Sequence, residues 1–218
     1  MKKNYKLMIA CDGGAASGKT TGAKLISKKY NLKFLSSGIL YRYASFLILK
    51  KKPKNKINFL KKKFKTLNLN KVKKLDLHNA EISEHTSIIA KEKKIRFILK
   101  MFQKKFSKKY ARPIIEGRDI ATVILPKADI KFFFKCGLNT AAKRRFKELK
   151  KKNSKIRFAD VRKAIRIRNN RDKKRKNSPL IQSKDAVIVH TDKLKNIKGM
   201  INFMSKVVEK KIKDKYGN

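Results

Sequence analysis

The sequence predicts an α/β fold in which a parallel sheet is covered by helices on both faces. Short apolar runs alternate with longer segments of helical periodicity along the 218 residues, as in chains built from strand–helix units. Two runs, in PIIEGRD (113–119) and ADIKFFFKC (128–136), are bounded by turn residues and typical of central parallel strands. A glycine-rich stretch separates the first apolar run from the first helical segment. Such folds bind ligands at the carboxyl ends of their strands, where we expect the functional site.

The individual elements follow from hydrophobic periodicity and turn residues. Strands are predicted at 7–11 and 33–35, in the two runs named above, and in DAVIVHT (185–191). Helices are predicted at 19–29, 39–50, 84–109, 139–151, 158–171 and 197–211, with Asn139 as an N-cap. The apolar positions of helix 84–109 are expected to pack in the core: Ile88, Ile89, Ile95, Ile98, Leu99, Phe102 and Phe106. The Lys-rich segment 51–79 has weak periodicity, so we interpret it as an insertion and assign it no elements.

The charge of the chain is extreme. Lys and Arg number 62 against 15 acidic residues, which gives a formal net charge of +47 and invites a nucleic-acid interpretation. The Lys residues are spread along the chain, as expected for a solvated surface, whereas eight of the twelve Arg lie between residues 144 and 175. Because the planar guanidinium binds phosphate oxygens in pairs, this cluster favours a phosphate site. A hydrophobic content of 41% is sufficient for one folded core.

Cysteine, histidine and apolar residues restrict the class of protein further. Cys11 and Cys136 have no CxxC spacing and the three His are scattered, so neither a disulfide framework nor a metal cluster is predicted. The first ten residues are basic near their start, as in a signal peptide, but their apolar stretch is too short for one. No run approaches the length of a membrane span. We therefore expect a cytoplasmic protein with no membrane partner.

Residues 13–20, GGAASGKT, fit the pattern G-x-x-x-x-G-K-[ST] between a predicted strand and a predicted helix. Small residues let consecutive backbone N–H groups turn toward a phosphate, and the helix N-terminus adds partial positive charge. In such loops Lys19 reaches the β and γ phosphates, and the hydroxyl of Thr20 is placed for Mg²⁺. The loop indicates ATP or GTP, with Mg²⁺ as cofactor. The residues expected to bind it are Gly13, Gly14, Ala15, Ala16, Ser17, Gly18, Lys19, Thr20 and Thr21. The strand–helix context disfavours a chance glycine turn.

The loop alone does not specify the phosphate acceptor. Enzymes that use water as the acceptor usually follow a later strand with an Asp-Glu pair, which binds metal and orients the water. No apolar run of this chain ends in such a pair; the run that includes Ile115 gives Glu116, then Gly and Arg. The pattern therefore favours transfer to another molecule.

Three further stretches resemble a known family. LSSGILYR (35–42), EGRDIATVILP (116–126) and RNNRDKKRKNSPL (168–180), together with the glycine loop, resemble bacterial cytidylate kinases, which convert CMP and dCMP to diphosphates with ATP. The resemblance covers almost the whole chain and is weakest in 51–79. It implies the three-layer P-loop kinase fold, with a central five-stranded parallel sheet, an NMP-binding insertion and a short lid. A single domain is expected, with a core (about 1–50, 110–150 and 172–218), an NMP-binding region (about 36–109) and a lid (about 150–160).

The resemblance also implies roles in phosphoryl transfer. The reaction needs in-line positioning and spread positive charge, and the catalytic residues carried over are accordingly cationic: Lys19, Arg118, Arg168 and Arg171. Arg144, Arg145 and Arg157 lie around the expected lid, and the last two are assigned to ATP. The residues assigned to the acceptor phosphate are Ser37, Gly38, Arg42 and Arg118.

Recognition of the acceptor nucleoside is implied in the same way. Cytosine presents an amino donor beside two acceptors, N3 and O2, so a selective pocket needs a carboxylate or hydroxyl beside arginines. By the resemblance, Ser87 and Asp119 read the amino group, and Arg96 and Arg175 lie near the N3 and O2 edge. Asp172 is assigned to the ribose, and Arg168 helps to bind the nucleotide.

Structural interpretations of these residues stay open. The arginines of 168–175 also fit a solvated helix face, Asp119 an ion pair with Arg118 or a turn cap, and Ser87 an exposed helical position. The chain departs from the family pattern at three positions: Ser36 replaces an acidic residue, Gly14 a common Pro, and Ala121 a Gly. The last two changes are small enough to keep the backbone path.

Two other functions compete with this one. The nearest is another small-molecule or nucleoside monophosphate kinase, with UMP, AMP or dTMP as acceptor; an adenine pocket would not need the arrangement around Asp119. The other is a basic nucleic-acid-binding P-loop ATPase, which the missing acid pair and the lack of aromatics interleaved in the basic segments disfavour. The expected partners are CMP or dCMP and ATP, for a monomer without a specific nucleic-acid partner. Any RNA association should be weak and salt-sensitive.

Overall fold

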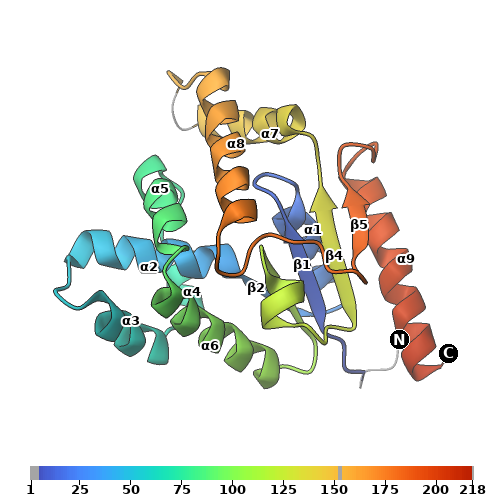
Figure 1. Cartoon of the computed structure of the whole chain (residues 1–218). Helices are drawn as coiled ribbons and strands as arrows, with labels where there is room; N and C mark the ends of the chain where they lie inside the picture. Colours follow the sequence, from blue (N-terminus) through green and yellow to red (C-terminus); the bar gives the residue numbers. More distant parts are fainter. Residues whose placement is uncertain (1–4, 152–153, 218) are drawn as a thin grey trace. The chain divides into compact units, whose positions relative to one another are not determined.

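The computed structural model describes residues 5–151 and 154–217, drawn as ribbons in Figure 1. The chain forms two compact units. The first contains the chain up to Leu35 and from Tyr110 onward, and the second is Ser36–Lys109. In the two described ranges, no helix is long and apolar enough to cross a membrane.

A five-stranded sheet forms the centre of the first unit. The strand order is β2 (Lys33–Ser36), β3 (Pro113–Gly117), β1 (Ile9–Gly13), β4 (Ile130–Lys135) and β5 (Val187–His190). β1 pairs in parallel with β3 on one side and β4 on the other, and β4 pairs in parallel with β5. The predicted parallel sheet is confirmed, although β1 begins two residues later than expected. Because β1 lies between β3 and β4, the loop that follows it is at the switch point where such sheets bind ligands.

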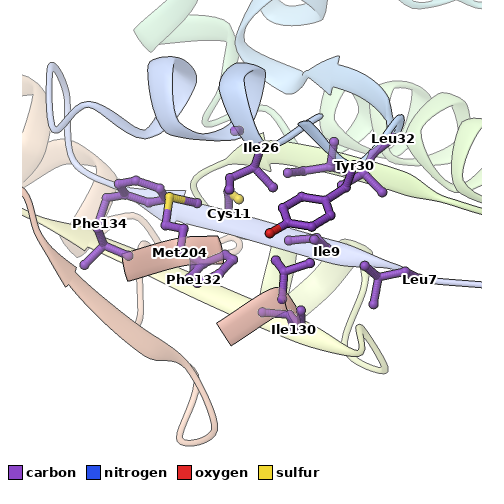
Figure 2. Packing of buried hydrophobic residues seen from close by; sticks show 14 of the residues in the cluster. Leu7, Ile9, Cys11, Ile26, Tyr30, Leu32, Ile130, Phe132, Phe134 and Met204 are labelled. Atoms are coloured by element: carbon purple, nitrogen blue, oxygen red, sulfur yellow. The ribbon is translucent and has the colours of Figure 1, made fainter. Parts of the chain in front are cut away.

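Helices cover both faces of this sheet. The helices of the first unit are α1 (Lys19–Lys29), α7 (Leu138–Lys150), α8 (Phe158–Lys174) and α9 (Ile197–Tyr216), with a π-helical turn η1 (Ile120–Ile124). On one face, Ile26 of α1 and Met204 of α9 pack in the core cluster with Phe134 of β4 (Figure 2). A Cβ at Gly22 of α1 would lie 2.9 Å from the Phe134 ring, so the missing side chain permits this close approach. η1 contacts β1 and β3 through the other face.

The described elements of the second unit are all helical. They are α2 (Ser37–Lys51), α3 (Lys56–Lys65), α4 (Leu69–Lys73), α5 (Ala80–Ile89) and α6 (Lys93–Lys109). The unassigned segment 51–79 thus contains two helices. Asn55 caps the N-terminus of α3, and Asn68 caps that of α4, through side-chain oxygens that accept backbone N–H bonds. Leu60 and Phe64 of α3 are buried, which explains why so Lys-rich a segment folds.

Two sequence predictions about helices were wrong. The segment 84–109 is two helices, because the N–H groups of Lys91 and Glu92 bond three residues back and end α5 in a tight turn. Ile88, expected in the core, is 49% exposed beside this turn. Asn139 is not an N-cap: α7 begins one residue earlier, after Gly137, and the Asn139 side chain accepts a hydrogen bond from Nε of Arg162 in α8 (2.7 Å).

Candidate active site

The glycine loop joins the end of β1 to the start of α1, as predicted. Gly13 has a φ of +157°, and a Cβ there would lie 2.6 Å from the backbone oxygen of Phe134, so only glycine fits. Gly18, directly before α1, has a φ of +85°, in the left-handed region that favours glycine. α1 has no side-chain cap and no acidic residue in its first turn. Its first N–H groups and the positive end of its dipole are therefore available to an anion in the loop.

Lys19 begins α1, and its ammonium group turns back over the loop. Nζ donates a hydrogen bond to the carbonyl oxygen of Gly14 (3.1 Å) and lies 4.0 Å from a carboxylate oxygen of Glu116 in β3. Burial lowers the pKa of Lys19 to about 7, and the positive charge of Arg118 acts in the same direction. A phosphate beside Nζ would favour the protonated form, so this environment is suited to an anionic ligand.

Arg118, which directly follows β3, connects the glycine loop to α8. Its Nε donates to Oδ2 of Asp172 (2.7 Å), and its Nη1 donates to the carbonyl oxygen of Gly13. Asp172 also pairs with Nη1 of Arg175 (3.2 Å), whose Nη2 lies 3.9 Å from Oδ1 of Asp119. Burial raises the pKa of Asp172, but three neighbouring arginines, Arg118 foremost, outweigh burial and hold this pKa below its usual value. Four predicted site residues thus form one charge network.

Asp119 belongs to this network. Its carboxylate oxygen Oδ1 lies 3.9 Å from Nη2 of Arg175. Asp119 precedes η1, but its side chain makes no cap hydrogen bond there. The carboxylate is buried beside an arginine, an environment suited to a side chain that hydrogen-bonds to the polar edge of a ligand.

Asp12 is a site residue that sequence analysis missed. It is fully buried in β1, and its two oxygens accept the backbone N–H groups of Ile120 (2.8 Å) and Ala121 (2.7 Å). Burial raises its pKa to about 7, although the two backbone bonds act in the opposite direction. A carboxylate inside an apolar run was the available signal. Because Ala121 contributes its backbone N–H, the Ala in place of the family's Gly leaves this contact intact.

Two more side-chain contacts hold the loop and a third supports one of them; none of these contacts was assigned from the sequence. Oδ1 of Asn169 in α8 accepts the N–H of Ala15 (2.8 Å). The hydroxyl of Thr191, one residue past β5, donates to the carbonyl oxygen of Ser17 (3.0 Å). Arg144 of α7 donates to the Thr191 hydroxyl (2.9 Å) and to its carbonyl oxygen (2.8 Å). Nothing local marks Thr191, which is brought to the loop by the sheet order.

The lid arginines have different environments. Arg144 belongs to the contacts of the glycine loop, as described above, but Arg145 pairs with Glu148 of its own helix (2.9 Å). Arg157 pairs with Asp160 (2.8 Å) and its side chain is 79% exposed. The predicted lid (150–160) falls partly outside the described residues, at 152 and 153. The ATP-binding roles of Arg145 and Arg157 stay predictions.

Arg168 and Arg171 lie on consecutive turns of α8, and both are half-buried. The charge of Arg168 lowers the pKa values of both Lys19 and Asp172, so its guanidinium lies within electrostatic range of the loop lysine and of the network. These positions are not those of a fully solvated basic face.

The remaining predicted residues belong to the second unit. Arg42 of α2 is buried, and its Nη1 donates to the carbonyl oxygen of Leu77 (2.9 Å) and to the Ser83 hydroxyl (2.8 Å). Arg96 of α6 is buried 5.6 Å from the ring centre of Tyr41 in α2.

The small residues of this group are less distinctive. Ser37 is buried and Gly38 follows it in the first turn of α2. Ser87 is half-buried in α5, and its hydroxyl donates to the carbonyl oxygen of Glu84 (2.9 Å). The acceptor roles of Ser37, Gly38 and Ser87 stay predictions.

Comparisons with known proteins show the family of the chain. A family model described as cytidylate kinase matches residues 9–210. A cytidylate kinase of Fusobacterium nucleatum is 35% identical over 94% of this chain and 98% of its own length, and one of Rickettsia rickettsii is 38% identical over 85% and 84%. The solved structure of a shikimate kinase from Bacteroides thetaiotaomicron, 11% identical, covers 93% of this chain and 98% of that chain with a TM-score of 0.51, a likeness of fold alone. The chain belongs to the cytidylate kinase family.

Proposed function

We propose that the protein transfers the γ-phosphoryl group of ATP to CMP or dCMP, giving ADP and CDP or dCDP. The observation that carries this proposal is the position of Arg118, which donates at once to the glycine-loop carbonyl of Gly13 and to Asp172 of α8. A guanidinium between a donor-phosphate loop and a nucleoside-binding network is what transfer between two nucleotides requires. The relatives named cytidylate kinase support the choice of acceptor.

The donor site fits MgATP. The N-terminus of α1 lacks a side-chain cap, and the buried hydroxyl of Ser17 has no hydrogen-bond partner within the described chain, so the loop offers donors to a phosphate. The loop residues through Thr21 would hold the phosphates, and the exposed hydroxyl of Thr20 would hold Mg²⁺. When bound, Mg²⁺ neutralises charge on the β and γ phosphates.

The protein residues divide the work of transfer. Lys19 would follow the charge as it moves from donor to acceptor. Arg118, Arg168 and Arg171 would spread positive charge around the transferring phosphoryl group. They would also hold the attacking oxygen of the acceptor and the leaving oxygen of the donor in line. Asp172 keeps the Arg118 fork fixed through a short hydrogen bond, which removes the need to reorganise it during the reaction.

Each unit, taken by itself, contains residues that we assign to the acceptor. In the first, Asp119 and Arg175 would read the cytosine edge and Asp172 the ribose. In the second, Arg42 would bind the acceptor phosphate, Ser87 would read the cytosine amino group, and Arg96 would lie near the N3 and O2 edge. We also propose that Ser36–Lys109, which forms a compact unit, is the monophosphate-binding region.

ADP formation with MgATP tests the proposal. Each of CMP, dCMP, UMP, AMP, dTMP and RNA is offered separately, with a reaction lacking acceptor as control, at low and moderate salt. Turnover confined to CMP and dCMP supports the proposal. Turnover with UMP, AMP or dTMP instead would assign another acceptor, and RNA-stimulated ADP formation without a monophosphate would replace the kinase with an ATPase.

A further inference from the structure

Asn169 and Asn170 separate Arg168 from Arg171 in α8. Asn169 contacts the glycine loop directly. Its Oδ1 accepts the N–H of Ala15 at 2.8 Å. Both terminal atoms of its amide, Oδ1 and Nδ2, lie 3.3 Å from the point that a Cβ on Gly14 would occupy. That distance is tighter than ordinary van der Waals contact, so a side chain at position 14 would displace the amide.

The same face of α8 continues this contact in both directions. One turn earlier, Ile165 is buried in a cluster with Ala15 of the loop. One turn later, Asp172 holds Arg118, which reaches the carbonyl oxygen of Gly13. The spacing of four and three residues places these contacts along one stripe of the helix. Asn169 is the polar contact in the middle, and it bonds directly to the loop backbone.

We infer that Asn169 is a positioning residue: its amide fixes α8 against the glycine loop and thereby sets the two flanking arginines for phosphoryl transfer. Gly14 is the second half of this contact, because the absence of a Cβ makes room for the amide. Gly14, which replaces the family's common Pro, and Asn169 therefore face each other across this contact. The kinetic part of this inference rests on the proposed function.

The test is a double-mutant cycle. Asn169→Ala is expected to lower kcat about five- to tenfold, the equivalent of one hydrogen bond, with the KM for ATP and CMP nearly unchanged. Asn169→Asp keeps an oxygen acceptor of the same size and is expected to retain most of kcat. Gly14→Ala is expected to lower kcat in the parent chain and to have much less effect in Asn169→Ala, because the displaced amide is already gone.

A measurement that needs no turnover separates this inference from the proposed function. Hydrogen exchange of the Ala15 amide is followed in the full-length parent, Asn169→Ala and Asn169→Asp. Faster exchange in Asn169→Ala alone supports the contact, even if CMP proves not to be the acceptor; kcat is then read with the acceptor that does react. Unchanged exchange of the Ala15 amide in Asn169→Ala overturns the inference, and so does faster exchange with an unchanged kcat. Equal losses of kcat in Asn169→Ala and Asn169→Asp also overturn it, as do additive effects of the Gly14 and Asn169 changes on kcat.

Discussion

Nε of Arg118 and Oδ2 of Asp172 lie 2.7 Å apart in an ion pair that joins the residue after β3 to α8. Both side chains are nearly buried, at 13% and 11% exposure, so neither charge can be hydrated if the other is removed. Pairs of this kind contribute little when intact but are costly to break from one side. The relationship gives Asp172 a structural role beside the nucleotide-binding role proposed for it.

Asp172→Asn is therefore expected to destabilise the protein. The neutral amide leaves Arg118 buried without its counter-charge, a loss of about 3 kcal/mol in the free energy of unfolding. Urea denaturation measures it. Asp160→Asn is the matched control. Asp160 lies in the same helix as Asp172 but pairs with the exposed Arg157, so this substitution should leave the unfolding midpoint unchanged. Equal midpoints for the parent and Asp172→Asn would contradict the prediction.

Lys19→Met should slow transfer severely while the fold persists. Methionine fills the space of the buried lysine stem but cannot stabilise the moving charge, so kcat should fall by about 10² to 10³-fold, the effect of removing one preorganised donor. ADP formation and circular dichroism test the two parts of the prediction. Lys24→Met, an exposed position in the same helix, is the control and should keep parental activity. Unchanged turnover in Lys19→Met would remove Lys19 from the catalytic residues.

Asp119→Ala should weaken the discrimination of CMP from UMP. A carboxylate accepts from the amino group of cytosine and repels the oxygen that uracil presents there, so its loss should reduce the ratio of kcat/KM values by about tenfold. The ratio is measured with both nucleotides at limiting concentration. Asp185→Ala, which removes an acid paired with Lys131 instead, serves as the control. A ratio that stays at the parental value would assign the base contact to another residue.

Asp12 predicts a pH dependence of stability with a defined sign. Its pKa in the folded state is about 7, against 3.8 as its ordinary value. Between these values the folded protein binds more protons than the unfolded chain, so the contribution of Asp12 is full at low pH and is lost as pH rises from 4 toward 7. Urea denaturation of the parent and Asp12→Asn at pH 5 and pH 8 tests this. The stability advantage of the parent should be larger at pH 5; an advantage that grows at pH 8 would reverse the sign.

The elements that sequence analysis predicted well are those with local signals. The glycine loop and the helix from Lys19 to Lys29 follow from an eight-residue pattern and its flanks, and the strands follow from apolar runs. The break after Ile89 could not be predicted, because neither Gly nor Pro marks it and the turn depends on backbone bonds. The helices of segment 51–79 are short, and their Asn caps stand among many other polar residues.

The predicted site shows the same limit. Arg118, Asp119 and Asp172 were assigned through short motifs, and the structure places them in one network. The partners of the loop were missed because they are remote in sequence: Ala15 and Asn169 are 154 positions apart. Contacts of this kind are set by strand order and helix docking, which no local pattern encodes.

The contacts that position the glycine loop run through its main chain. Four side chains bond to its backbone: those of Arg118, Asn169 and Thr191, from other parts of the chain, and that of Lys19, at its own end. The loop residues that they contact are Gly13, Gly14, Ala15 and Ser17. A loop held in this way tolerates drift among small residues, since exchanging one side chain for another removes none of these bonds. Sequence change in the loop is then limited by volume and backbone angle, whereas the outer partners are limited by chemistry. A chain under strong compositional pressure toward Lys can thus vary widely at its surface and still keep the same phosphate cradle.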